Sequence, residues 1–71
     1  MKEVKSSNIY AVGWTAEHGL MIQFKGKDGK PSGTYHYADA PQSAHDELMA
    51  AKSHGSHFLK NIRDSYKGVK Q

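Results

Sequence analysis

The chain has no cysteine among its 71 residues. Disulfide bonds, zinc sites built on thiolates and thiol catalysis are therefore excluded, and the hydrophobic core must hold the fold without a covalent or metal staple. A chain of this length buries only about 60% of the surface that it exposes when unfolded. We expect one small domain over residues 1–71, with an ordered core from about residue 3 to about residue 66, in a reducing environment.

Long hydrophobic runs are lacking as well. No apolar stretch approaches the roughly 20 residues that a membrane-spanning helix needs. The opening residues, Met1 to Val4, are typical of a strand and not of the apolar segment of a secretory signal. We therefore expect a cytoplasmic protein that does not bind membranes.

The net charge is small, +3, but it is unevenly distributed. Residues 38–51 carry three acidic residues and no basic one, whereas residues 52–71 carry five basic residues and one acidic residue. The last third of the chain therefore produces most of the positive field, which favours polyanionic partners.

The first half of the chain has the patterns of β-strands. Leu20, Ile22 and Phe24 alternate with polar or flexible residues, and the other strand segments are rich in β-branched and aromatic residues. Gly19 suits a tight turn, and the glycine-rich segment Gly26–Gly33 suits an exposed loop. The predicted strands are Ile9–Trp14, Leu20–Lys25 and Thr34–Ala38, with Lys2–Ser6 as a possible edge strand.

The second half has the spacing of two helices. A first helix is predicted from about Pro41 to Ser53, with Gly55 as a left-handed end. Ser56 would cap a second helix, in which Phe58, Ile62 and Tyr66 share the packing face. Residues 67–71 are expected to fray. The predicted fold class is α+β: an antiparallel meander of three to four strands followed by two helices packed on one sheet face.

A set of residues spread over roughly Val4 to Tyr66 has the order and spacing of a known domain family. These residues are Val4, Ser6, Ser7, Ile9, Val12, Gly13, Leu20, Ile22, Phe24, Tyr35, Tyr37, Pro41, Leu48, Ala51, Ser53, Gly55, Phe58, Ile62, Arg63 and Tyr66. Together they resemble the KTSC family, a domain named for its occurrence at the C-terminus of some lysyl-tRNA synthetases. The resemblance implies a bacterial or phage protein and, through the attachment to a synthetase, RNA binding by association.

Tyr35 and Tyr37 are the first candidate site residues. Two positions apart on a strand, their rings lie on one side about 7 Å from each other, a spacing at which exposed rings can each stack on a nucleobase. The other interpretation, which we favour, is that both rings fill the core between sheet and helices. The alternation alone does not decide which side they occupy.

Basic residues are the second candidate. Lys60, Arg63 and Lys67 would form a stripe on the second helix, and Lys25, Lys27 and Lys30 would add a second patch on the long loop. Such a stripe is also typical of a solvated helix face. Arg63 matches the family pattern, and its guanidinium can bind phosphate in a bidentate manner or pair with Asp39 or Glu47 inside the fold.

Other chemistry finds little support in the sequence. The five histidines lack a metal-binding spacing, the serines lack the context of an activated nucleophile, and only about two residues separate the helices, fewer than in a helix-turn-helix motif. We expect no enzyme, no metal and no cofactor.

The leading hypothesis is a small binding module for RNA or another nucleic acid. The alternative is a protein-interaction module that uses the uncovered sheet face around Met21, Gln23 and His36.

Overall fold

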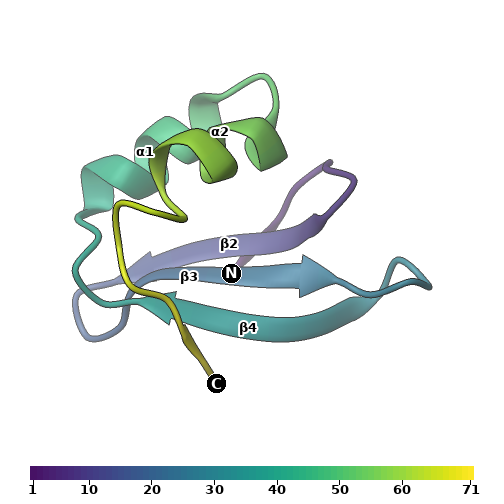
Figure 1. Ribbon diagram of the computed structural model, residues 1–71, viewed down its shortest axis with the longest axis horizontal. Helices are drawn as coiled ribbons and strands as arrows, with labels where there is room; N and C mark the ends of the chain where they lie inside the picture. The colour runs from purple at the N-terminus through teal and green to yellow at the C-terminus, as the bar shows by residue number, and fades with distance from the viewer.

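The structure, a computed structural model, describes residues 1–71 as a sheet covered on one face by two helices (Figure 1). Each strand pairs antiparallel with its neighbours in the order β1-β2-β3-β4-β5. The predicted α+β class is confirmed, and a fifth strand extends the meander. Neither helix has the length and apolar character to cross a bilayer. The elements are β1 (Lys2–Glu3), β2 (Ile9–Thr15), β3 (Gly19–Lys25), β4 (Pro31–Tyr37), α1 (Gln42–Ala50), α2 (His54–Asn61) and β5 (Val69–Lys70).

The turn between β2 and β3 forms as predicted. Gly19 has a φ of 73°, and a Cβ there would clash with the backbone carbonyl of Tyr37. The Thr15 hydroxyl accepts a hydrogen bond from the His18 N–H at 3.0 Å, which holds the turn from its other side. Glycine is therefore required here both by the backbone conformation and by the space available.

The connection between β3 and β4 is shorter than predicted. The composition predicts a loop over Gly26–Gly33, but β4 already begins at Pro31. The Gly26 N–H donates to the Lys30 carbonyl at 2.8 Å, and Gly29 takes a φ of 78° between them. Local hydrogen bonds thus close a tight hairpin, and strand pairing overrides the loop-like composition of the segment.

The helices have different ends from those predicted. α1 stops at Ala50, because Ala51 is extended, with φ −70° and ψ 144°. Ser53, not Ser56, is the N-cap of α2: its hydroxyl accepts from the Ser56 N–H at 3.3 Å. Gly55 therefore lies inside α2, where a Cβ would come within 2.6 Å of the Asn8 amide oxygen, and it is not a left-handed helix end.

The expectation that residues 67–71 fray was wrong. Val69 and Lys70 form β5, paired with His36 and Tyr35 of β4, and the Gln71 N–H donates to the Thr34 carbonyl at 2.9 Å. Unpaired backbone groups along the edge of β4 provide these partners. They could not be located without the sheet order.

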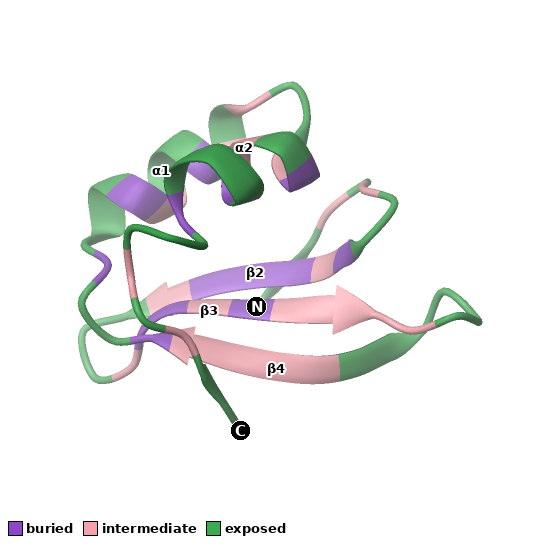
Figure 2. Ribbon diagram, viewed as in Figure 1, coloured by how far each residue is buried: buried purple, intermediate pink, exposed green.

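The core lies between the helices and one face of the sheet, and the buried parts of both helices face the strands (Figure 2). Trp14 joins the two layers at one end, since its indole N–H donates to the Ala40 carbonyl at 3.0 Å. No buried side-chain nitrogen or oxygen lacks a hydrogen-bond partner. The core cluster is Ile9, Val12, Leu20, Ile22, Tyr37, Ala40, Ala44, Leu48, Phe58 and Ile62.

Candidate nucleic-acid interface

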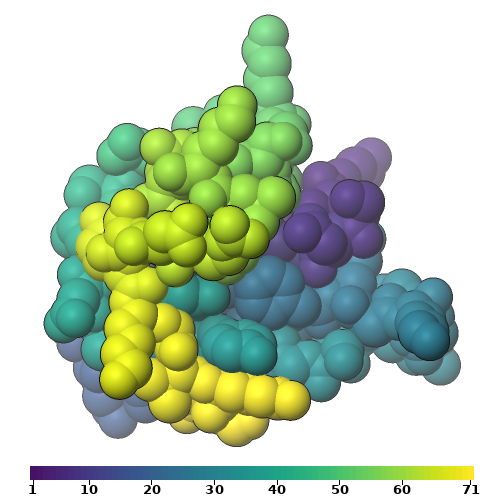
Figure 3. All heavy atoms as spheres, in the orientation of Figure 1, coloured from purple at the N-terminus to yellow at the C-terminus, as the bar shows by residue number.

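A groove opens between α2, the ends of β3 and β4, and the strand β5. In the space-filling view it lies between the lime-coloured surface of α2 and the yellow C-terminal segment, with the blue and teal surfaces of β3 and β4 below (Figure 3). Its volume is about 420 Å³. The residues that line it are Phe24, Lys25, Ser32, Gly33, Tyr35, Tyr37, Phe58, Arg63 and Lys70.

The floor of the groove consists of aromatic rings. Phe24 packs edge-on against Tyr35, with ring centroids 5.6 Å apart, and against Phe58 at 5.4 Å. Tyr37 meets Phe58 edge-on at 5.9 Å. These edge-to-face contacts are the favoured geometry for aromatic pairs, so the floor is one packed cluster of rings.

Tyr35 and Tyr37 both lie on the face of the sheet that the helices cover. Tyr37 is 4% exposed and belongs to the core, whereas Tyr35 is only partly buried and lies at the groove. Burial raises the pKa of the Tyr37 hydroxyl, and the nearby charge of Tyr35 adds to the increase. The core interpretation is therefore confirmed for Tyr37, while Tyr35 keeps a surface that a ligand can reach.

Three cationic side chains border this floor, and no carboxylate lines the groove with them. Arg63 follows the end of α2, and Lys70 is the partner of Tyr35 in the pairing of β4 with β5. Lys25 lies at the end of β3 and donates from its ammonium to the Ser6 carbonyl. Paired residues in an antiparallel sheet point to the same face, so Lys70 projects on the side of Tyr35.

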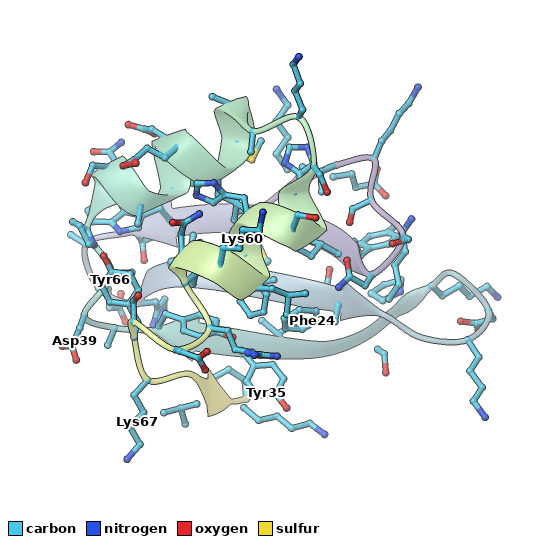
Figure 4. The ribbon with its side chains drawn as sticks, turned by 45° about the horizontal axis from the view of Figure 1, so that its top comes forward. Phe24, Tyr35, Asp39, Lys60, Tyr66 and Lys67 are labelled. Atoms are coloured by element: carbon cyan, nitrogen blue, oxygen red, sulfur yellow. The ribbon has the colours of Figure 1, made fainter.

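The predicted basic stripe on the second helix does not exist. α2 ends at Asn61, so Arg63 and Lys67 follow the helix and do not continue its face. The Phe58 carbonyl accepts from both the Ile62 N–H at 3.0 Å and the Arg63 N–H at 2.9 Å, which turns the chain. Lys60 stays on the outer surface of α2, and the Lys67 side chain points outward, away from Phe24 and Tyr35 (Figure 4). Of the three, Arg63 alone reaches the groove.

The pairing of Arg63 also differs from the two predicted possibilities. Its Nε lies 3.5 Å from the carboxylate of Asp64, the next residue in the chain, and not near Asp39 or Glu47. Both side chains of this pair are more than half exposed, so the ion pair is weak. The guanidinium therefore remains available to a stronger anionic partner.

The loop lysines do not form one patch. Lys25 belongs to β3 and is held by Ser6, whereas Lys27 is exposed in the hairpin loop and does not line the groove. Sequence reasoning misses Lys70, because the sequence predicts that residues 67–71 fray. Phe24 and Phe58 carried a signal, their apolar periodicity, but it indicated only that they are core residues.

The histidines have local structural roles. His54 Nδ1 lies 2.9 Å from the Leu48 carbonyl near the end of α1, and His57 contacts the Asn61 amide one turn later at 3.3 Å. His18 and His36 lie against each other on the uncovered sheet face, with ring centroids 4.6 Å apart and the ring planes tilted by 38°. No cluster of three or more His, Asp or Glu residues with a geometry suited to a metal ion occurs.

Comparison with known proteins agrees with this architecture. The model of the KTSC domain matches residues 5–66, which is most of the chain. The chain belongs to the KTSC domain family. The crystal structure of a KTSC domain protein from Yersinia pestis superposes on it with a TM-score of 0.84 and 32% sequence identity, covering 99% of this chain and 93% of the other. The comparison with curated proteins finds no match. The family resemblance inferred from the sequence is thus confirmed over nearly the whole domain.

Proposed function

We propose that this KTSC domain protein is a small non-catalytic module that binds single-stranded nucleic acid, RNA in the first place, in the aromatic groove. The observation that supports the proposal is the combination of an aromatic floor with the cations Lys25, Arg63 and Lys70 around it. We place this activity in the cytoplasm, the setting that the family resemblance implies.

The chemistry of the groove matches a base next to its phosphates. Tyr35 and Phe24 offer ring surfaces to a base, a contact that does not depend on sequence because every base has a π-face. Arg63 and Lys70 offer charge to the neighbouring phosphates, and the guanidinium of Arg63 can bind two phosphate oxygens at once. A volume of about 420 Å³ suits one nucleotide-sized group. A duplex keeps its bases stacked and cannot present one to the floor, so a single strand is favoured.

The charge distribution orients such a ligand. α1 carries Asp46 and Glu47 on its exposed surface, while the cations of the groove lie between α2 and β5. A polyanion is therefore repelled from one part of the helical layer and attracted to the groove.

A salt titration with a fluorescently labelled single-stranded RNA of about ten nucleotides tests the proposal. We expect Arg63→Glu to weaken binding and to reduce the slope of log affinity against log salt by about one or more. Tyr35→Ala should weaken binding without changing that slope, because it removes a stacking surface and no charge.

Lys67→Glu is the matched control, since it makes the same charge reversal in the same segment but outside the groove. It should have a much smaller effect than Arg63→Glu. Absence of binding at low salt, or equal losses for Arg63→Glu and Lys67→Glu, would contradict a site in the groove.

A second candidate function uses the uncovered sheet face to bind a protein. Val69 is 54% exposed and Met1 is 56% exposed, and the His18 and His36 rings lie on this face as well. Pull-down with the tagged protein, before and after nuclease treatment, separates the two functions. Specific retention of one protein after nuclease digestion, lost in a Met21→Glu variant, would favour this candidate over nucleic-acid binding.

A further inference from the structure

The strand β5 is one wall of the groove, and the groove loses a cation without it. The pairing of Tyr35 with Lys70 aligns the lysine beside the aromatic floor. Residues before this strand do not supply an equivalent charge, because Lys67 points away from the floor. The composition of the site therefore depends on whether β5 is docked on β4.

Gly68 is the residue that lets β5 dock. A Cβ at this position would lie 2.5 Å from Tyr37 Cε2 and 2.7 Å from Tyr37 Cζ, distances that a real side chain cannot adopt. The Tyr37 ring cannot easily move aside, because it is buried against Phe58. Glycine is needed here because of the close approach to the ring, and its φ is not in the left-handed region.

β5 is held by few contacts. It has two paired residues, both exposed, and one further hydrogen bond from the Gln71 N–H to the Thr34 carbonyl. A short segment with little buried apolar surface opens at a much lower free energy than the whole domain. Docked and undocked states of β5 are therefore both accessible, and a ligand that contacts only the docked state shifts the balance between them.

We propose that β5 is a ligand-coupled wall of the groove: Lys70 contacts a phosphate of the bound strand, and Gly68 is the positioning residue that brings it there. This inference rests on the proposed function, since it names how the same site is completed. A ligand that binds the docked state more tightly shifts the docking equilibrium by the ratio of its affinities for the docked and undocked states. Filling the groove therefore strengthens the docking of β5.

A double-mutant cycle on RNA affinity tests the coupling. Lys70→Gln keeps the strand and removes the charge, so it should reduce the salt slope by about one. Gly68→Val undocks the strand and should reduce the slope by the same amount. The double variant should bind like Gly68→Val alone. Once β5 is undocked, Lys70 no longer contacts the RNA, so removing its charge has no further effect on affinity. Val69→Thr is the matched control on the other face of β5 and should bind like the unmodified protein.

Amide hydrogen exchange supplies a readout that a purely structural role would not change. The Gln71 amide should be protected in the free protein, more protected with saturating RNA, and unprotected in Gly68→Val. Where Gly68→Val fails to fold, Gln71→Pro, which removes the N–H that bonds to Thr34, replaces it in the cycle.

The outcomes separate the two proposals. The unmodified protein could bind RNA while the losses of affinity from Lys70→Gln and Gly68→Val add, or while the protection of the Gln71 amide does not change with RNA. Either result would refute the coupling of β5 to the ligand, and the groove would still stand as the nucleic-acid site. If the unmodified protein does not bind RNA at all, the proposed function fails, and the inference fails with it.

Discussion

Tyr37 shows how a single side chain links the core to the groove. Its ring is buried against Phe58, its backbone carbonyl lies against Gly19, and Gly68 passes directly over its edge. Three segments that are distant in the sequence therefore meet at one residue. A change at Tyr37 should alter both the stability of the domain and the docking of β5.

Alkaline pH should destabilise the protein through this tyrosine. Burial raises the pKa of Tyr37, so the folded protein releases the proton at a higher pH than the unfolded chain does. The resulting contribution to the free energy of unfolding is fully present below about pH 10, the ordinary tyrosine pKa, and is lost as the pH rises through the raised value.

Urea denaturation of the unmodified protein and of Tyr37→Phe between pH 8 and pH 11 provides the measurement. The loss of stability above pH 10 should be smaller in the variant. Tyr10 acts in the same direction, because a hydrogen bond and the charge of Glu3 raise its pKa. Some loss of stability at alkaline pH should therefore persist in Tyr37→Phe. An identical pH profile for both proteins would rule out the role of Tyr37.

At the scale of elements, the ends of α2 matter more than its length. Its start is set by the Ser53 cap, and its end by the Phe58 carbonyl, which accepts from two successive N–H groups. Ending the helix at Asn61 directs Arg63 toward the groove and Lys67 away from it. The position of the helix end therefore decides which basic residue belongs to the site.

Removal of the cap distinguishes the observed start of α2 from the predicted one. Ser53→Ala should lower the free energy of unfolding by about 1 kcal/mol, because it leaves the Ser56 N–H without its partner. Ser56→Ala is the control: this hydroxyl is exposed and caps nothing, so stability should hardly change. Chemical denaturation measures the free energy of unfolding of both variants. A larger loss of stability for Ser56→Ala would show that Ser56 is the helix cap, as predicted from the sequence.

The two edge strands are another element-scale feature. β1 and β5 each have two residues, and each contains a lysine, Lys2 or Lys70. Short, charged edges discourage pairing with the sheet of a second molecule. In β5 the same lysine also faces the groove, so one residue serves both the edge and the site.

For the molecule as a whole, stability depends on the single contact layer between helices and sheet. With 71 residues the core is small, and six side chains are less than 2% exposed: Ile9, Val12, Leu20, Ile22, Ile62 and Leu48. Leu48 connects α1 to this layer and is fully buried. The domain therefore has little reserve against loss of a core contact.

Truncation of Leu48 should be severe. Leu48→Ala removes buried methyl groups and leaves a cavity, at a cost of about 3 kcal/mol in the free energy of unfolding. Leu59→Ala is the matched control, because Leu59 on α2 is 44% exposed and should lose little. Thermal denaturation of the two variants is the measurement; similar melting temperatures would contradict the two-layer core.

The sequence alone determined the family, the α+β class, the positions of the strands β2 and β3 and the apolar faces of the helices. These features depend on periodicity and on turn residues such as Gly19, which act over a few neighbouring positions. The tertiary structure decided what depends on contacts distant in the chain: the burial of Tyr37 beside a more accessible Tyr35, the end of α2 before Arg63, and the pairing that brings Lys70 to the groove. A two-residue strand such as β5 has no periodicity of its own, and its order comes only from the edge of β4 and the space that Gly68 leaves over Tyr37.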